Sequence, residues 1–286
     1  NIKMDKIKKV YIDSRYSTSD SNSNSDFKFA LKEQIDVPEN TVCYIDDISI
    51  PHSWYTLEEY NNRLYIQYEN TLIERGWDFI VVILPTGNYT GITFASSLQA
   101  EVQKKIPGMS CVYNPARGTI TITGESVFRV LTDNHFIPGY YSMVFFEYAN
   151  EDWRDVDDNP VTVVASNLMS LNEVIRNNQV QPNANTEFET GFLDLLNTHN
   201  IYLHCPNLGH YNCIGVRGEN SIIKKIPVSS SFGYLILDSV VAPHDKIDVS
   251  RQSIKTLQFT LKNVHGNIIN LHGAHISFSL VFQTIE

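Results

Sequence analysis

The chain has 286 residues, of which 42% are hydrophobic, 11% aromatic and 19% charged, so it can bury a sizeable core in one large or two small domains. Its 22 Lys and Arg against 32 Asp and Glu leave a formal net charge of −10, which argues against the basic surface of a nucleic-acid binder. The longest apolar run, at 79–84, is far shorter than the roughly 20 residues of a transmembrane helix. We therefore expect a soluble chain with no membrane span and no direct nucleic-acid ligand.

The N-terminal part predicts β-strands, because apolar and polar residues alternate with a period of two. In chain order the expected strands span residues 8–14, 27–31, 41–50, 64–68 and 77–84. Between the first two, residues 14–25 are rich in Ser, Asn and Asp and indicate a polar loop.

The middle of the chain has a different pattern. Ala95, Leu98, Val102 and Ile106 recur at spacings of three and four, which predicts a helix at about 93–106 that ends before Pro107. A hairpin with strands at 110–114 and 119–123 follows it. Residues 131–195 include the acidic stretch 151–158 and an Asn/Gln-rich stretch at 177–185, and we expect exposed loops with short helices or strands there.

The C-terminal part returns to strands, expected at 201–205, at 234–241 and in two final segments. Leu257, Phe259 and Leu261 alternate with polar residues in the first of these segments. Residues 276–282 repeat the pattern, with one apolar face and one mostly small and polar face. The helix at 93–106, the strand before it and the hairpin after it therefore form a strand, helix, strand, strand unit that is inserted into an otherwise all-β chain.

Nine histidines raise the question of a metal site, because imidazole is a common metal ligand. The densest grouping consists of His204, Cys205, His210 and Cys213. Its spacing matches no usual zinc pattern, and a strand that ends before Pro206 and continues into a loop explains it better. Two further histidines, His272 and His275, would face opposite sides of a strand. We expect no metal and no other cofactor.

Candidates for acid–base or nucleophilic catalysis are weak. Asp46 and Asp47 are adjacent in an expected strand, so only one of them can face inward. The acidic stretch 151–158 lacks the glycine and final glutamate of a calcium loop. No serine-hydrolase, phosphate-loop, zinc-protease or dinucleotide motif occurs, although Cys205 or Cys213 beside a histidine remains open as a nucleophile. We expect no enzyme.

The aromatic content suits a structural building block. Fifteen Tyr and 14 Phe exceed what one core needs, and aromatic side chains are enriched at buried subunit contacts. The alternative is that they fill a large core between two sheets.

Segments spread over about two thirds of the chain resemble one protein family. They are residues 11–15, 19–21, 25–27 and 45–56 near the N-terminus and 206–209, 217–219, 222–228 and 271–279 in the C-terminal third. In this order they resemble the minor capsid, or penton, proteins of virophages and Polinton/Maverick elements.

The resemblance implies an all-β single jelly roll, with two antiparallel sheets and Greek-key connections, and an α+β insertion. Residues 1–84 and 196–286 would form the jelly roll, and residues 85–195 an outward-projecting insertion domain. The length fits this arrangement, since two jelly rolls of about 200 residues each would not fit.

The resemblance also implies a function. The family forms homopentamers at the vertices of an icosahedral virus particle, surrounded by trimers of a double-jelly-roll major capsid protein, and a host receptor is a further partner for the insertion. It implies no catalytic, cofactor-binding or metal-binding residues and leaves the interface residues unknown. Two alternatives stay open: a carbohydrate- or receptor-binding jelly roll, and a metal-dependent jelly-roll enzyme.

Overall fold

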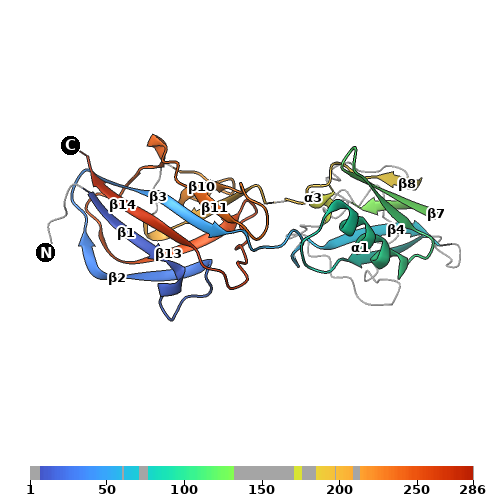
Figure 1. Cartoon of the computed structure of the whole chain (residues 1–286), viewed down its shortest axis with the longest axis horizontal. Helices are drawn as coiled ribbons and strands as arrows, with labels where there is room; N and C mark the ends of the chain where they lie inside the picture. Colours follow the sequence, from blue (N-terminus) through green and yellow to red (C-terminus); the bar gives the residue numbers. More distant parts are fainter. Residues whose placement is uncertain are drawn as a thin grey trace. The chain divides into compact units, whose positions relative to one another are not determined.

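A computed structural model describes residues 7–59, 61–70, 77–131, 171–175, 185–196, 198–208 and 213–285. The chain divides into two compact units. Unit 1 combines Asn1–Trp54 with Thr198–Glu286, and unit 2 is Tyr55–Asn197. In Figure 1, unit 1 therefore carries the blue and the orange-to-red parts of the chain, and unit 2 carries the intervening colours.

Unit 1 contains two antiparallel sheets. The first has the order β1 (Ile7–Asp13), β14 (Ser277–Thr284), β3 (Thr41–Pro51) and β11 (Leu235–Asp238), with β12 (Ile247–Asp248) also paired to β3. The second has the order β10 (Ile222–Pro227), β9 (Asn200–His204), β13 (Ser253–Asn263) and β2 (Asp26–Asp36). Short 3-10 turns are η1 (Ser14–Tyr16), η3 (Pro206–Leu208) and η4 (Pro243–Asp245). This distribution of strands over two sheets is that of a jelly roll.

The core of unit 1 lies between the two sheets and follows from the alternation in the sequence. Phe259 of β13 packs against Phe27 of β2, with ring centroids 5.5 Å apart, and edge-on against Phe278 of β14 at 4.9 Å. All three side chains are buried, and each contributes about 1.5–3 kcal/mol through the removal of its apolar surface from water. The inward-facing residues of both sheets thus hold the sandwich together.

Unit 2 is a five-stranded antiparallel sheet with a helix on it. The strand order is β5 (Trp77–Ile83), β4 (Arg63–Glu69), β7 (Thr119–Leu131) and β6 (Ser110–Asn114), with β8 (Asn185–Glu189) also paired to β7. Helix α1 (Gly91–Gln103) buries Phe94, Leu98 and Val102 in the same cluster as the sheet, and α3 (Leu171–Val174) adds to this cluster. None of the helices in the described ranges has the length and apolarity of a membrane span.

The ends of α1 differ from the expected 93–106. The helix begins at Gly91 because Thr90 and Thr93 form a reciprocal capping box, in which each side chain hydrogen-bonds the other residue's backbone N–H. It ends at Gln103, and Ile106 is only partly buried against the cluster beyond the last turn.

The expected boundary of the jelly roll at residue 84 is wrong. Residues 55–84 belong to unit 2, since Tyr65 of β4 pairs with Leu131 of β7 and β5 pairs along the other edge of β4. Alternation showed that these segments are strands but carried no information on their partners. Strands β10 and β12 were not expected, whereas β8 is one of the short elements expected within residues 131–195. The acidic stretch 151–158 and most of the Asn/Gln-rich stretch lie outside the described residues.

Candidate functional site

The side chains around His204 and Cys205 are buried and used for packing. His204 Nδ1 lies 3.0 Å from the Ser221 hydroxyl, and burial, together with the nearby positive charge of Lys262, lowers the pKa of His204. Burial raises the pKa of the Cys205 thiol to about 12, so at neutral pH it is not the thiolate that a nucleophile requires. Cys213 is half-buried, and burial raises its thiol pKa as well.

The remaining candidate metal ligands are not brought together among the residues that the structure describes. Across the described residues no group of three or more His, Cys, Asp or Glu side chains is placed to hold a metal ion. His210 lies outside these residues. His272 and His275 precede β14 rather than lying on a strand, and the His275 Nδ1 is 3.2 Å from the Ser14 hydroxyl.

The carboxylates of Asp46 and Asp47 both face outward. The register of β3 against β14 shifts at this point, so that Ser279 pairs with Asp47, and the next residue of β14, Leu280, pairs with Ile45. Asp46 is therefore the extra residue of a β-bulge, which breaks the expected alternation. The Lys9 ammonium binds Asp46 at 2.6 Å and Asp47 at 3.2 Å, and hydrogen bonding to Asp46 raises the Lys9 pKa. The pair is a surface ion cluster and not a catalytic dyad.

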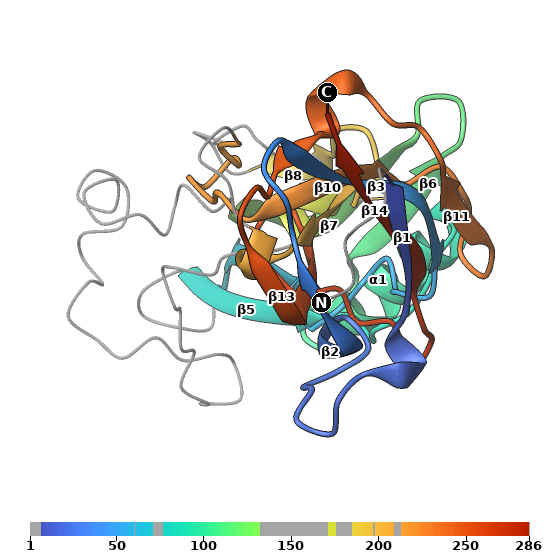
Figure 2. The same ribbon diagram turned by 90° about the vertical axis from the view of Figure 1, so that its left-hand side faces the viewer.

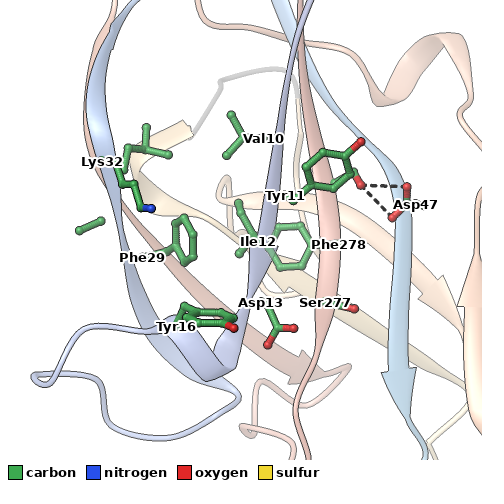
Figure 3. A pocket seen from close by; sticks show the side chains of 13 residues that line it. Val10, Tyr11, Ile12, Asp13, Tyr16, Phe29, Lys32, Asp47, Ser277 and Phe278 are labelled. Carbon is green, nitrogen blue, oxygen red and sulfur yellow. Dashed lines mark hydrogen bonds between the residues drawn. The ribbon is translucent and has the colours of Figure 1, made fainter.

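A cavity of about 740 Å³ opens between β1 and β2. These two strands are the outermost strands of their respective sheets, so neither covers the gap between the sheets. Figure 3 shows Val10, Ile12 and Phe29 beside the gap, with Tyr16 and Lys32 at its edge. We call this feature the β1–β2 cavity; its lining also includes Asp13, Leu31, Ser277 and Phe278.

The charged rim of the β1–β2 cavity is fixed by an ion pair. The guanidinium of Arg15 binds both carboxylate oxygens of Asp13, at 3.0 Å from Nε and 2.5 Å from Nη2. Hydrogen bonding to Arg15 lowers the pKa of Asp13, which therefore stays ionised at neutral pH. The cavity thus has an apolar interior and a charged rim.

The first sheet of unit 1 ends in β1 at the cavity and in β11 at its other edge, and that other edge carries exposed apolar side chains. Strand β11, labelled in Figure 2, is the outermost strand there. Side chains in and beside it are 45–70% exposed. They are Phe232, Tyr234, Leu235, Leu237 and Val240. We call these residues the β11 patch.

A buried lysine fixes the C-terminal end of the β11 patch. The Lys224 side chain is only 4% exposed, and its ammonium lies 3.7 Å from Asp238 and 3.5 Å from Asp245. It also donates to the backbone carbonyl of Val240. A buried charge is tolerated only where it is paired and hydrogen-bonded, so this network holds residues 238–245 in one conformation.

A stacked histidine fixes the other end of the patch. The ring of His52, at the end of β3, lies 4.2 Å from the Trp54 ring and edge-on to Phe232 at 6.2 Å. Its Nδ1 donates to the Ser230 carbonyl at 2.7 Å, and backbone hydrogen bonds join His52 to Gly233 and Tyr234. Burial lowers the pKa of His52, which keeps the ring neutral at pH 7.

The sequence analysis predicted neither the β1–β2 cavity nor the β11 patch, and it named no interface residues. The β11 patch had a usable signal, since residues 226–237 contain no Asp, Glu, Lys or Arg and residues 234–237 are uniformly apolar. The cavity had none, because it depends on which strands end each sheet. Both surfaces present apolar side chains that a partner of similar character could contact.

Comparison with known proteins adds one finding. No protein-family model matches the chain, and no curated protein matches it. Among solved structures, the chain is similar to the crystal structure of the SeMet-labelled mavirus penton protein, with a TM-score of 0.50 over 98% of this chain and 100% of that chain. The two proteins share a fold. The sequence identity is 8%, so the match concerns the fold alone, and it confirms at that level the resemblance seen in the sequence.

Proposed function

We propose that the protein is a structural minor capsid protein that forms the pentameric vertex capsomer, or penton, of an icosahedral virus particle. The supporting observation is the fold shared with the mavirus penton protein over nearly the full length of both chains, including the unit between β3 and β9. A partial match to a jelly roll alone would be weaker support, since that fold serves many functions.

The proposed role is geometric and not catalytic. Subunits related by one fifth of a turn close into a ring when each contact joins two different surfaces of the same chain. The neighbours of such a ring would be trimers of a double-jelly-roll major capsid protein, and the protein would be located at the capsid vertices. Unit 2 is then the outward-projecting part and the candidate contact with a host receptor.

The side chains that could have supported an enzyme favour the structural role. Cys205 carries a raised thiol pKa, and Asp46 and Asp47 share the ammonium of Lys9 on the surface. Neither arrangement presents an activated nucleophile to a substrate.

Negative-stain electron microscopy of the purified protein, alone and coexpressed with the major capsid protein, tests the proposal. We expect rings with five-fold symmetry and a mass by light scattering of five subunits. A chain that stays monomeric in both preparations would refute the role. Binding of that monomer to a glycan array would instead favour a carbohydrate- or receptor-binding jelly roll.

A further inference from the structure

The two edges of the first sheet of unit 1 differ in a way that matters for assembly. At one edge, β1 borders the apolar β1–β2 cavity. At the other, β11 carries the exposed side chains of the β11 patch. A hollow and a set of projecting apolar side chains therefore lie on opposite edges of one sheet.

We propose that the β11 patch of one copy docks against the β1–β2 cavity of the next copy. The proposal rests on the ring-forming function proposed above and names the two surfaces that join neighbouring subunits. The contact is heterologous, so each copy keeps one free cavity and one free patch until the ring closes.

The composition of the patch fits a subunit contact. From Phe232 to Val240 the one charged residue is Asp238, whose side chain is only 12% exposed and is paired with Lys224, so the exposed surface of the patch is uncharged. Depletion of charge and enrichment of aromatic residues distinguish the centre of an interface from the rest of a surface. Tyr234, which is 70% exposed, is the type of residue that supplies large binding energies at such centres.

The size of the patch also fits. With about 150–250 Å² for a large aromatic side chain and somewhat less for an aliphatic one, the observed exposures correspond to on the order of 600 Å² of apolar surface. One partner of a stable interface contributes about 800 Å². The five residues of the β11 patch therefore supply most of one side of a subunit contact.

The patch is held at both ends by contacts within the single chain. Lys224 fixes its C-terminal end through Asp238, Asp245 and the carbonyl of Val240, and His52 fixes its N-terminal end. Surfaces that are ordered before binding lose less conformational entropy on association. A buried lysine and a stacked histidine that both brace one exposed strand indicate a surface built for contact.

Strand β11 also needs a cover for a second reason. An outermost strand with exposed apolar side chains is a site of uncontrolled association, which proteins normally prevent with charges, proline or a covering element. Leu235 and Leu237 project from this strand with no charge between them, so a partner copy is the covering element that fits best.

Site-directed cross-linking tests the pairing of the two surfaces. In a Cys213→Ser background, whose remaining cysteines are buried, Leu237→Cys marks the patch and Lys32→Cys marks the cavity rim. We expect a short bis-maleimide to join the two variants when they are mixed and neither variant to itself. Both substitutions in one chain should give a covalent ladder that stops at five subunits. Leu237→Cys mixed with Val112→Cys, exposed in unit 2, is the control pair and should not cross-link.

The outcomes separate this proposal from the proposed function. Five-fold rings with no link between patch and cavity, or with Leu237→Cys linked only to itself, overturn the pairing and leave the penton role intact. A chain that never assembles overturns both. As a second variant, Leu237→Asp should weaken ring formation at least tenfold in a dilution series while leaving the thermal transition of the monomer unchanged, and Val112→Asp should affect neither.

Discussion

Replacement of Lys224 by methionine tests whether the buried ion network holds the edge of the jelly roll. The substitution keeps the length of the side chain but leaves Asp238, whose side chain is 12% exposed, and Asp245, 34% exposed, without their cation. Removal of one partner of a buried pair costs about 3–5 kcal/mol. Because Asp245 can regain water, we expect a loss of about 2–4 kcal/mol in the free energy of unfolding of unit 1.

Differential scanning calorimetry measures this loss. At roughly 3 °C per kcal/mol for a unit of this size, the unit 1 transition should fall by about 6–12 °C. Lys225→Met is the matched control, since the neighbouring Lys225 is exposed and should shift the transition by less than about 2 °C. Addition of Asp238→Asn to Lys224→Met should restore part of the stability because it removes an unpaired charge. Equal effects of Lys224→Met and Lys225→Met would refute the reasoning.

Two further predictions concern the units separately and the effect of pH. Phe259→Ala in unit 1 and Phe94→Ala in unit 2 each remove a fully buried ring and should each lower the free energy of unfolding of their own unit by about 3–5 kcal/mol. In calorimetry each substitution should lower the transition of one unit and leave that of the other unchanged. A shift of both transitions by one substitution would show that the units unfold together. Hydrogen bonds from Lys28 and then Thr18 lower the pKa of Asp20 from 3.8 to about 2. A lowered folded-state pKa stabilises the native state above the ordinary value of 3.8 and loses this effect as the pH falls toward 2. Asp20→Asn should therefore be less stable than wild type at pH 6 in urea, with the difference shrinking toward pH 2, and a pH-independent difference would contradict this.

The sequence determined the local structure wherever one face of an element is buried. Alternation predicted β3 and β14, and the three- and four-residue spacing of Leu98 and Val102 predicted α1. Only its ends shifted, because the capping box at Thr90 lies outside the apolar pattern. Strand β10 was not predicted because its apolar and polar residues do not alternate regularly. Lys224 shares the buried face of β10 with Ile226, so a charged residue stands where the period of two leads one to expect an apolar one. A bulge between Ile222 and Lys224 buries Ile223 as well, which interrupts the alternation.

Tertiary structure decided which strands are neighbours and which surfaces remain open. Period-two patterning states which face of a strand is buried but not which strand lies beside it, so β4 and β5 were assigned to the wrong unit. The β1–β2 cavity and the β11 patch exist because these strands end their sheets, and strand order results from contacts between residues far apart in the chain. The buried faces were therefore readable in the sequence, whereas the surfaces proposed for assembly required the assembled sheets.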